Sequence, residues 1–568
     1  MGRMPDENYR MATESRMPHV AGPVLIALAA TVATVGTLAP EGWGPGVTCD
    51  EMYHIAVGKR LVMALRQQGA GFFAPGNIER NFPWSPDGAP VHPPLGNWVL
   101  GFTHHVFDVA PDDPRAVSIL PARFAPALGF GLLVLLVGLW TTRAEGPLAG
   151  TAAAAAVVLV PRLFAHAHLA ALDMLTALMF VAAVLAVADA EARGDRLWRY
   201  GLAGVIWGLA MLTRFHGLLV LPPVVVWLAW RLRHRAVLPI LAWAGAGVAT
   251  FFAGWPWLWL APIAHMKQLF ASATGRQAVH VFYLGRVWAD REAPWHYPLV
   301  MFVVALPMGL LLLGLLGAWA SRRTWNAKPG YLLVVGTLGF MLLVFAWPGT
   351  PVYDGVRLFL MVFPLWAISV GIGAKWVVEH PAWKGIAVGW RLTAVGLFIA
   401  LQGAGLVLYH PCQLSHYSLL VGGLRGAEKL GFEVTYWGDA VPESVLAEAA
   451  RRTRGEPVLF APSLAYFQLE GVWRSSPALT EKARIDGRVP LAGWEQGWSQ
   501  PPLGARYAVL YHRKAELEAP GAIPRRLWSM GVVAERKRQG VWLARLVELP
   551  TVPAQGGLPG AISAPGAR

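Results

Sequence analysis

The run VAGPVLIALAATVATVGTLAP, residues 20–40, contains no charged side chain and is long enough to cross a bilayer as a helix. It is soon followed by VTCDEMYH, residues 47–54, in which Asp50 and Glu51 stand side by side. Adjacent carboxylates repel each other, and carboxylates near lipid are costly. The pair therefore marks either an ordinary loop start or a site at the membrane surface.

The composition is that of a membrane protein. Of the 568 residues, 55% are hydrophobic and 14% are charged, whereas a soluble protein carries about a quarter charged residues. The formal net charge is +14, much of it in short loops between apolar runs. Basic residues placed there set orientation in the bilayer, so we expect a lipid bilayer and no nucleic acid as partner.

Apolar runs of spanning length recur along the chain, and they predict a polytopic α-helical membrane protein with about eleven transmembrane helices. The predicted spans lie near 20–40, 118–142, 147–164, 172–190, 198–213, 215–231, 238–260, 297–318, 330–348, 357–376 and 390–409.

The basic loops predict the orientation. Residues 1–19 are polar and do not resemble a cleavable signal peptide, so we expect a cytoplasmic N-terminal tail. The short loops that then fall inside hold Arg143, Arg193, Arg196, Arg199, Arg231, Arg233, Arg235, Arg322, Arg323, Lys328, Lys375, Lys384 and Arg391. The outer short loops hold little beyond Arg162, Arg214 and Arg357, which is the expected asymmetry.

This topology divides the chain into regions. The membrane domain covers 20–410 and includes extracytoplasmic loops at about 41–117 and 262–296. We expect a small extracytoplasmic α/β domain over 411–549 and a disordered tail over 550–568, which is rich in Pro, Gly and Ala. The α/β domain is predicted from a helical pattern at Ser444–Arg452 and from strand patterns at Pro457–Phe460, Tyr507–Tyr511 and Val541–Val547.

Two cysteines, Cys49 and Cys412, each follow a predicted span on the outer side. Two cysteines do not make a disulfide framework. A bridge between them is conceivable in an oxidising compartment, but two unpaired thiols are the favoured interpretation.

Ionisable and polar groups from distant parts of the chain converge on the outer leaflet, where such groups are functional candidates. The groups are Asp50 and Glu51; His92 in HPPLGNWVLGF, which we expect to lie as an interfacial helix; His166, His168 and Asp173 in PRLFAHAHLAALD; and Tyr353, Asp354 and Arg357 in TPVYDGVRLF.

Each group also has a plainer explanation. Asp50 could simply cap a helix, and Arg357 could extend its side chain to the membrane surface. His166 and His168 could bind a metal with Asp173, but residues two apart do not share a helix face. A structural or hydrogen-bonding role for both histidines is therefore favoured.

The residue types suggest a chemistry. A carboxylate at a water–lipid boundary can act as a general base, and a second carboxylate nearby raises its pKa. Tyr353 and Arg357 share a face if their turn is helical, and a guanidinium beside a phenol suits a phosphate. The loop 262–296 adds Lys267, Arg276, His280, Arg286 and Arg291, which fit either an anionic head group or simple attraction to the membrane surface.

The motifs DEMYH, HPPL, PRLFAHAHLAALDM and YDGVRLF, in this order and on one side of the membrane, resemble those of the GT-C glycosyltransferases. The chain is most similar to the protein O-mannosyltransferase and aminoarabinose transferase group, including bacterial members. The resemblance covers about residues 20–440, and it implies a multi-span enzyme that takes a sugar from a polyprenyl-phosphate carrier at the outer face.

The resemblance also implies roles for individual residues. Asp50, with Glu51, matches the acidic pair that acts as base or positions the acceptor, and Asp173 matches the second acidic position. Tyr353 and Arg357 match phosphate contacts. His92 stands where some relatives have Lys, so its contact with phosphate or sugar is less well supported.

The mechanism implied is an inverting displacement, in which Asp50 deprotonates an acceptor hydroxyl and Arg357 and the cationic loop, including Arg276 and His280, stabilise the departing phosphate. This chemistry requires no cofactor; a divalent metal is possible, but no convincing ligand set supports one. The alternatives are a transporter or lipid-carrier flippase, and a non-catalytic membrane scaffold. Ionisable groups gathered at one edge rather than at mid-membrane argue against transport.

Overall fold

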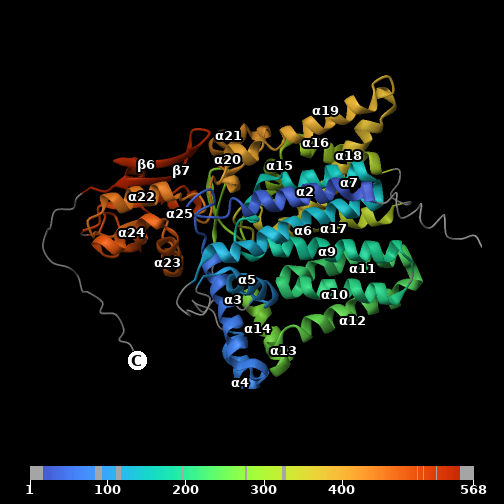
Figure 1. The fold of residues 1–568 in the computed structure, drawn as a ribbon, viewed down its shortest axis with the longest axis horizontal. Coiled ribbons are helices and arrows are strands. Elements are labelled where there is room, and N and C mark those ends of the chain that lie inside the picture. Colours follow the sequence, from blue (N-terminus) through green and yellow to red (C-terminus); the bar gives the residue numbers. More distant parts are fainter. Residues whose placement is uncertain are drawn as a thin grey trace, which may run out of the picture.

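The computed structural model describes residues 17–83, 92–109, 117–194, 196–274, 278–322, 328–495, 497–502, 504–519 and 521–550. Long helices lie side by side along the long axis of the molecule, and a sheet with its own helices lies at one end of them (Figure 1). The predicted disordered tail therefore falls outside the described residues except for Pro550, and the predicted cytoplasmic tail except for residues 17–19.

Six helical segments of the described chain are long and apolar enough to cross a membrane. They are α6 (Ile119–Glu145), α9 (Leu172–Ala192), the segment Phe215–Ala253, α17 (Pro329–Ala346), α18 (Val362–Glu379) and the segment Val388–Tyr409. A seventh results if α15 (Tyr297–Ala305) and α16 (Met308–Ser321), which meet at 111°, form one broken span. The chain is thus a polytopic helical membrane protein.

The predicted count of about eleven spans is not confirmed, although each predicted range falls on helical residues. Helix length explains the difference, because crossing about 30 Å of hydrocarbon takes about 20 helical residues. α7 (Pro147–Val158) and α10 (Leu197–Thr213) have 12 and 17 residues, fewer than the 18 of the shortest counted span, and α2 (Met17–Val35) provides a described apolar helix only over Val20–Val35. Two predicted spans share one segment, which consists of η2 (Phe215–Val220), α11 (Leu221–Leu232), η3 (Arg233–Ala236) and α12 (Val237–Ala253).

Shorter elements gather at the end of the bundle that faces the sheet (Figure 1). They are α3 (Cys49–Gln68), η1 (Gly69–Phe73), α4 (Pro75–Asn81), α5 (Leu95–Phe107), α8 (Pro161–His166), α13 (Pro256–Leu260), α14 (Pro262–Thr274) and the hairpin of β1 (His280–Tyr283) and β2 (Arg286–Ala289). The predicted interfacial helix corresponds to α5, which leaves Phe102, Val106 and Phe107 exposed along one apolar edge.

The backbones of α3 and α5 touch where the two helices cross. A Cβ atom on Gly58 would overlap the carbonyl oxygen of Asn97, and a Cβ atom on Gly101 would overlap the backbone of Gly58. Small residues permit such a close approach. The crossing also places His54 Nδ1 2.9 Å from Asn97 Oδ1, and so fixes the first turns of α3.

A mixed sheet of five strands follows the membrane helices, in the order β4-β3-β5-β7-β6. β4, β3 and β5 are parallel, whereas β7 pairs antiparallel with both β5 and β6. The strands are β3 (Val458–Ala461), β4 (Leu491–Gly493), β5 (Tyr507–Tyr511), β6 (Val532–Arg538) and β7 (Val541–Glu548).

Helices flank these strands and connect them to the bundle. They are η6 (Gln413–Ser415), η7 (Leu419–Val421), α21 (Gly423–Lys429), α22 (Glu443–Arg452), α23 (Tyr466–Ser475), α24 (Pro477–Asp486), α25 (Lys514–Leu517) and η8 (Arg525–Trp528). Within the bundle, η4 (Arg357–Phe359) precedes α18, η5 (Pro381–Trp383) follows it, and α19 (Val388–Leu401) and α20 (Ala404–Tyr409) make up the segment Val388–Tyr409. The helix predicted at Ser444–Arg452 and the three predicted strands are each confirmed to within one residue at either end. β4 is only three residues long, and β6 is a charged edge strand, so neither carries a clear strand pattern.

Arg162 of α8 anchors the segment that leads to the sheet. It is 1% exposed, donates to Tyr436 Oη at 2.9 Å and to the carbonyl oxygen of His416 at 3.0 Å, and lies 4.5 Å from the centroid of the Tyr417 ring. Cys49 and Cys412 are not joined by a disulfide. The sheet is therefore held against the bundle by side-chain contacts.

Candidate active site

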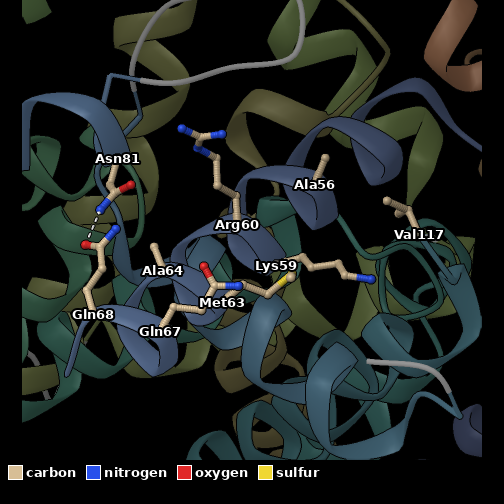
Figure 2. A pocket seen from close by; sticks show the side chains of 9 residues that line it. All are labelled: Ala56, Lys59, Arg60, Met63, Ala64, Gln67, Gln68, Asn81 and Val117. Atoms are coloured by element: carbon tan, nitrogen blue, oxygen red, sulfur yellow. Dashed lines mark hydrogen bonds between the residues drawn. The ribbon is translucent and has the colours of Figure 1, made fainter. Parts of the chain in front are cut away.

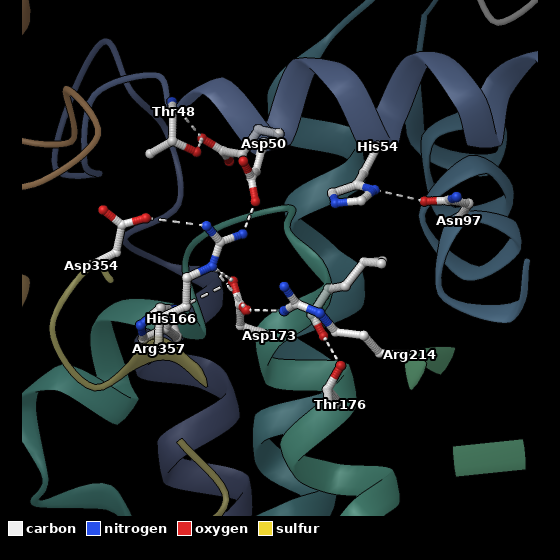
Figure 3. Close-up of polar contacts among 12 residues, drawn as sticks. Thr48, Asp50, His54, Asn97, His166, Asp173, Thr176, Arg214, Asp354 and Arg357 are labelled. Atoms are coloured by element: carbon white, nitrogen blue, oxygen red, sulfur yellow. Dashed lines mark hydrogen bonds and ion pairs between the residues drawn. The ribbon is translucent and has the colours of Figure 1, made fainter. Parts of the chain in front are cut away.

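Asp50 and Glu51 lie in the first turn of α3 and face different neighbours. Thr48 is the N-cap residue, and both its backbone N–H and its hydroxyl donate to Glu51 Oε2 at 3.0 Å. Glu51 thus closes a capping box, which satisfies donors that a helix start leaves free. Asp50 is offset by about 100° around the helix and reaches Arg357 instead (Figure 3).

Glu51 is fully buried and binds several parts of the protein at once. Arg123 of α6 donates to its two carboxylate oxygens at 2.7 and 2.9 Å, and the backbone N–H of Ala170 donates at 2.9 Å. Arg123 in turn donates to the backbone carbonyls of residues 38, 45 and 46. Glu51 therefore joins α3, α6 and the segment that precedes α9.

Arg357 contacts three carboxylates from separate segments of the chain (Figure 3). Its Nη2 pairs with Asp50, its Nε lies 3.2 Å from both oxygens of Asp173, and its Nη1 lies 3.3 Å from Asp354 Oδ2. The planar guanidinium group presents several donors in fixed directions, which suits it to this position. The Arg357 side chain is 6% exposed and that of Asp50 is 27% exposed, so Asp50 is the carboxylate open to a ligand.

Two further arginines complete the arrangement. Arg214, the C-cap residue of α10, pairs with Asp173, and Arg513 Nη2 lies 3.1 Å from Asp354 Oδ1. We refer to the six residues as the Asp–Arg cluster: Asp50, Asp173, Asp354, Arg214, Arg357 and Arg513. Buried charges need such pairing, and in the cluster the carboxylates and the guanidinium groups are equal in number.

Aromatic rings flank Arg357. Its Cζ lies 4.5 Å from the centroid of the Trp437 ring and 5.8 Å from that of Tyr353. The helical turn that would put Tyr353 and Arg357 on one face is not present, because Asp354 and Gly355 have φ values of 55° and 70° and form a turn before η4. The turn itself brings the two side chains together, and it buries Asp354, whose pKa is raised by that burial.

The two histidines of PRLFAHAHLAALD, His166 and His168, have different neighbours. His166 Nδ1 is 3.9 Å from Asp173 Oδ2, and burial lowers the pKa of this imidazole to about 4. His168 bonds at 2.8 Å to both Thr37 Oγ1 and the carbonyl oxygen of Phe164, which confirms the hydrogen-bonding role predicted for it. Across the described part of the chain, no group of three or more His, Cys, Asp or Glu side chains is placed to hold a metal ion.

His92 lies beside α3, near the cluster. Its ring centroid is 5.4 Å from that of His54 and 6.2 Å from that of Tyr53. Burial, with Arg214 nearby, lowers the pKa of His92 to about 4, and burial also lowers the pKa of His54. Both imidazoles are therefore neutral at pH 7, and each offers one donor and one acceptor.

Of the cations predicted for the loop 262–296, His280 has a partner in the sheet unit. His280 lies in β1, is 38% exposed and has Nδ1 3.7 Å from Glu516 Oε1 of α25. It therefore faces the sheet unit rather than Arg357. Arg276 lies outside the described residues.

Three members of the cluster have no role that follows from the sequence. In the sequence Arg214 is one of the outer-loop cations, and Asp354 is part of a polar segment. Arg513 lies in a tail without any recognised motif, more than 150 residues from its partner Asp354. For Arg214 a usable signal existed, since an arginine between two short apolar runs needs a buried partner.

A cavity of about 330 Å³ lies further along α3 from Asp50 (Figure 2). Lys59 and Arg60 line it together with the amide side chains of Gln67, Gln68 and Asn81, and Asn81 Nδ2 donates to Gln68 Oε1 at 3.2 Å. None of the predicted site residues lines this cavity, so it is separate from the Asp–Arg cluster.

The part of the chain that contains Asp173 and Arg214 matches a known protein family. Residues 91–259 match the family model of dolichyl-phosphate-mannose-protein mannosyltransferases. This match confirms the predicted resemblance to the GT-C glycosyltransferases, and it includes His92, Asp173 and Arg214 but not Asp50 or Arg357. No curated protein matches the chain.

Two solved structures show a partial likeness to this chain. ArnT from Cupriavidus metallidurans, bound to undecaprenyl phosphate, is 16% identical with a TM-score of 0.49, and the match covers 94% of this chain and 99% of that one. The Archaeoglobus fulgidus oligosaccharyltransferase in the apo form is 13% identical with a TM-score of 0.45, and the match covers 86% of this chain and 69% of that one. Both TM-scores lie below 0.5.

Proposed function

We propose that this protein is a membrane glycosyltransferase that moves a sugar from a polyprenyl-phosphate donor to an acceptor hydroxyl at the outer face of the membrane. The observation that carries the proposal is the Asp50–Arg357 pair, a partly open carboxylate held against a buried guanidinium group. The mannosyltransferase match to residues 91–259 supports the reaction class.

Asp50 is the proposed base. The Glu51 side chain is 0% exposed and pairs with Arg123. The Asp173 side chain is 1% exposed and pairs with Arg214 and Arg357. Asp50 is 27% exposed, so an acceptor hydroxyl reaches it most easily. Its carboxylate takes the hydroxyl proton, the oxygen attacks the anomeric carbon, and the bond from that carbon to the phosphate oxygen breaks with inversion.

Arg357 is the proposed phosphate contact, with Tyr353 beside it. A phosphate that enters the site competes with Asp50, Asp173 and Asp354 for the same guanidinium donors. When the phosphate binds Arg357, the Asp50 carboxylate is released from that guanidinium group and can accept the proton of the acceptor hydroxyl. The departing polyprenyl phosphate takes the bonding electrons, and its charge is stabilised by Arg357 and Arg214.

The proposed topology has a cytoplasmic N-terminus, about eleven spans, and both the Asp–Arg cluster and the sheet unit outside the cytoplasm. The described structure supports a location of the cluster and the sheet unit on the same side of the membrane. Both lie at one end of the bundle (Figure 1). Basic residues such as Arg143 and Arg231 share a cavity lining with Lys328 at the opposite ends of the span helices, as the positive-inside rule expects of a cytoplasmic end.

The test is sugar transfer by purified protein from a panel of radiolabelled polyprenyl-phosphate sugars, with the envelope fraction of the producing cells as acceptor. Asp50→Asn should abolish transfer while the protein still folds. Asp189→Asn is the matched control, because Asp189 is also a partly exposed acid paired with an arginine, at 2.9 Å from Arg193, but lies away from the cluster.

The results of this assay distinguish the identity of the base, the reaction class and the alternative of a flippase. Transfer by the wild type and by Asp189→Asn, but not by Asp50→Asn, supports both the reaction and the base. Transfer that survives in Asp50→Asn excludes Asp50 as the base. A wild type that transfers none of the sugars contradicts the proposal, and lipid-linked sugar that crosses vesicle membranes without transfer would identify a flippase.

A further inference from the structure

A second cavity, of about 350 Å³, lies in the sheet unit. Its lining includes Ser463, Trp494, Tyr511, Arg513 and Glu516. Small-molecule sites occupy roughly 300–1,000 Å³, so the cavity matches a compact ligand. Peptide recognition, in contrast, uses a sheet edge or an extended groove.

The cavity lies at the carboxyl ends of parallel strands. β3 ends at Ala461, two residues before Ser463, and its parallel neighbour β5 ends at Tyr511, two residues before Arg513. In sheets of this kind, ligands bind in the crevice outside the carboxyl ends of the strands. The place of the cavity is therefore a usual place for a ligand.

Arg513 connects the cavity to the Asp–Arg cluster. It lines the cavity, and its Nη2 also lies 3.1 Å from Asp354 Oδ1, the carboxylate that contacts Arg357. A ligand in this cavity would thus lie against a residue of the Asp–Arg cluster.

The lining suits a polyhydroxylated ligand. Trp494 and Tyr511 supply ring surface, Ser463 supplies a hydroxyl, and Glu516 and Arg513 supply a charged acceptor and charged donors. Trp494 is 3% exposed, and its indole N–H has no hydrogen-bond partner among the described residues. A buried donor left unsatisfied costs free energy, so a bound hydroxyl close to that ring would relieve the cost.

We propose that this cavity holds a sugar unit of the acceptor, so that the acceptor is a glycan rather than a peptide. The proposal rests on the glycosyltransferase function proposed above. In this arrangement the sheet unit selects the acceptor, and Arg513 links the filled cavity to Asp354 and Arg357.

The experiment compares two substitutions of exposed serines in the sheet unit. Ser463→Trp fills the mouth of the cavity, and Ser499→Trp, which lies outside the lining, is the matched control. The probe is the mixture of water-soluble glycans released from the envelope of the producing cells. Ser463→Trp should raise the glycan KM in the transfer assay by about tenfold or more, and by more than it changes the donor KM. Ser499→Trp should match the wild type.

Hydrogen exchange provides a readout that needs no transfer. The glycan mixture should protect residues 507–517 in the wild type and in Ser499→Trp, but not in Ser463→Trp. Absence of protection in the wild type, an unchanged glycan KM in Ser463→Trp, or transfer to peptides in place of glycans would each overturn the proposal. Protection without any sugar transfer would contradict the proposed function while the glycan site stands.

Discussion

Two neighbouring carboxylates in this protein have separate surroundings. Glu51 is fully buried and its oxygens accept bonds from Thr48, Arg123 and Ala170, whereas Asp50 is 27% exposed and contacts Arg357. The difference arises because consecutive helical residues point about 100° apart. Because both residues are acidic and adjacent, the sequence alone does not distinguish the capping residue Glu51 from the proposed base Asp50. The burial of the two side chains does distinguish them.

Arg357→Lys should lower the rate of sugar transfer by roughly 100-fold. Removal of one preorganised group that donates hydrogen bonds to the developing charge has an effect of about this size. A lysine ammonium group cannot contact Asp50, Asp173 and Asp354 in the directions that the guanidinium group does. The measurement is kcat with a saturating donor, with the exposed Arg143→Lys as control. A loss smaller than about threefold would contradict a direct role for the guanidinium fork.

Glu51→Gln should destabilise the protein by roughly 3–5 kcal/mol, because it leaves the buried Arg123 without its anionic partner. Thermal unfolding in detergent measures the change. Asp50→Asn makes the same chemical change one residue away, and it should lower the melting temperature much less. A stable but inactive Glu51→Gln would instead move the base from Asp50 to Glu51.

At the scale of elements, the crossing of α3 and α5 sets the position of Asp50. Asn97 on α5 bonds to His54, one turn after Asp50, and the backbones touch at Gly58 and Gly101. A shift of α5 would therefore move the first turn of α3 relative to Arg357.

Gly58→Ala should lower the transfer rate by about tenfold or more, because a displaced first turn misplaces Asp50. Stability should also fall, since the added methyl group meets backbone atoms of Asn97 and Gly101. Gly201→Ala is the control, because Gly201 is also helical and a Cβ there meets nothing within 4 Å. Equal effects of the two substitutions would show that the crossing does not control the site.

A second element prediction concerns the start of α25. Glu433 accepts from the backbone N–H groups of Lys514 and Ala515 at 2.7 and 2.8 Å, and burial raises its pKa from 4.5 to about 7. The folded state then binds more protons than the unfolded state between these values, so stability should fall as pH rises from 4.5 to about 7. Glu433→Gln should remove this slope in melting temperature, and a slope that persists unchanged would assign it to another group.

In the molecule as a whole, the Asp–Arg cluster and the basic residues Arg143, Arg231 and Lys328 lie at opposite ends of the bundle. The sheet unit contributes Arg513 to the Asp–Arg cluster at one end. At the other end, Arg143, Arg231 and Lys328 meet around one cavity. The orientation in the bilayer can therefore be tested by finding which of the two ends is accessible from outside the cell.

Cysteine labelling in intact cells answers that question. In a background that carries Cys49→Ser and Cys412→Ala, a membrane-impermeant maleimide should label Ser499→Cys, which is exposed in the sheet unit. Ala192→Cys, exposed at the end of α9, should react only after the cells are lysed. The reverse pattern would place the cluster in the cytoplasm and contradict an outer-face reaction.

The amino-acid sequence is sufficient to predict the class of the protein, the helical ranges, much of the sheet unit and the GT-C resemblance. These follow from local signals: runs without charge, periodicity, and short motifs such as DEMYH and YDGVRLF. It also nominated Asp50, Asp173, Tyr353 and Arg357, which meet in the structure.

The pairing of charges, in contrast, is visible only in the three-dimensional arrangement of the helices. Asp173 with Arg214, Asp354 with Arg513, and Glu51 with Arg123 are separated by 41 to 159 residues, and no local pattern records such contacts. The structure also separated the helix-capping Glu51 from the open Asp50, because burial depends on what α6 and the segment before α9 place around each carboxylate. The composition of the site is a property of packing, whereas the helices and the family resemblance are properties of the chain.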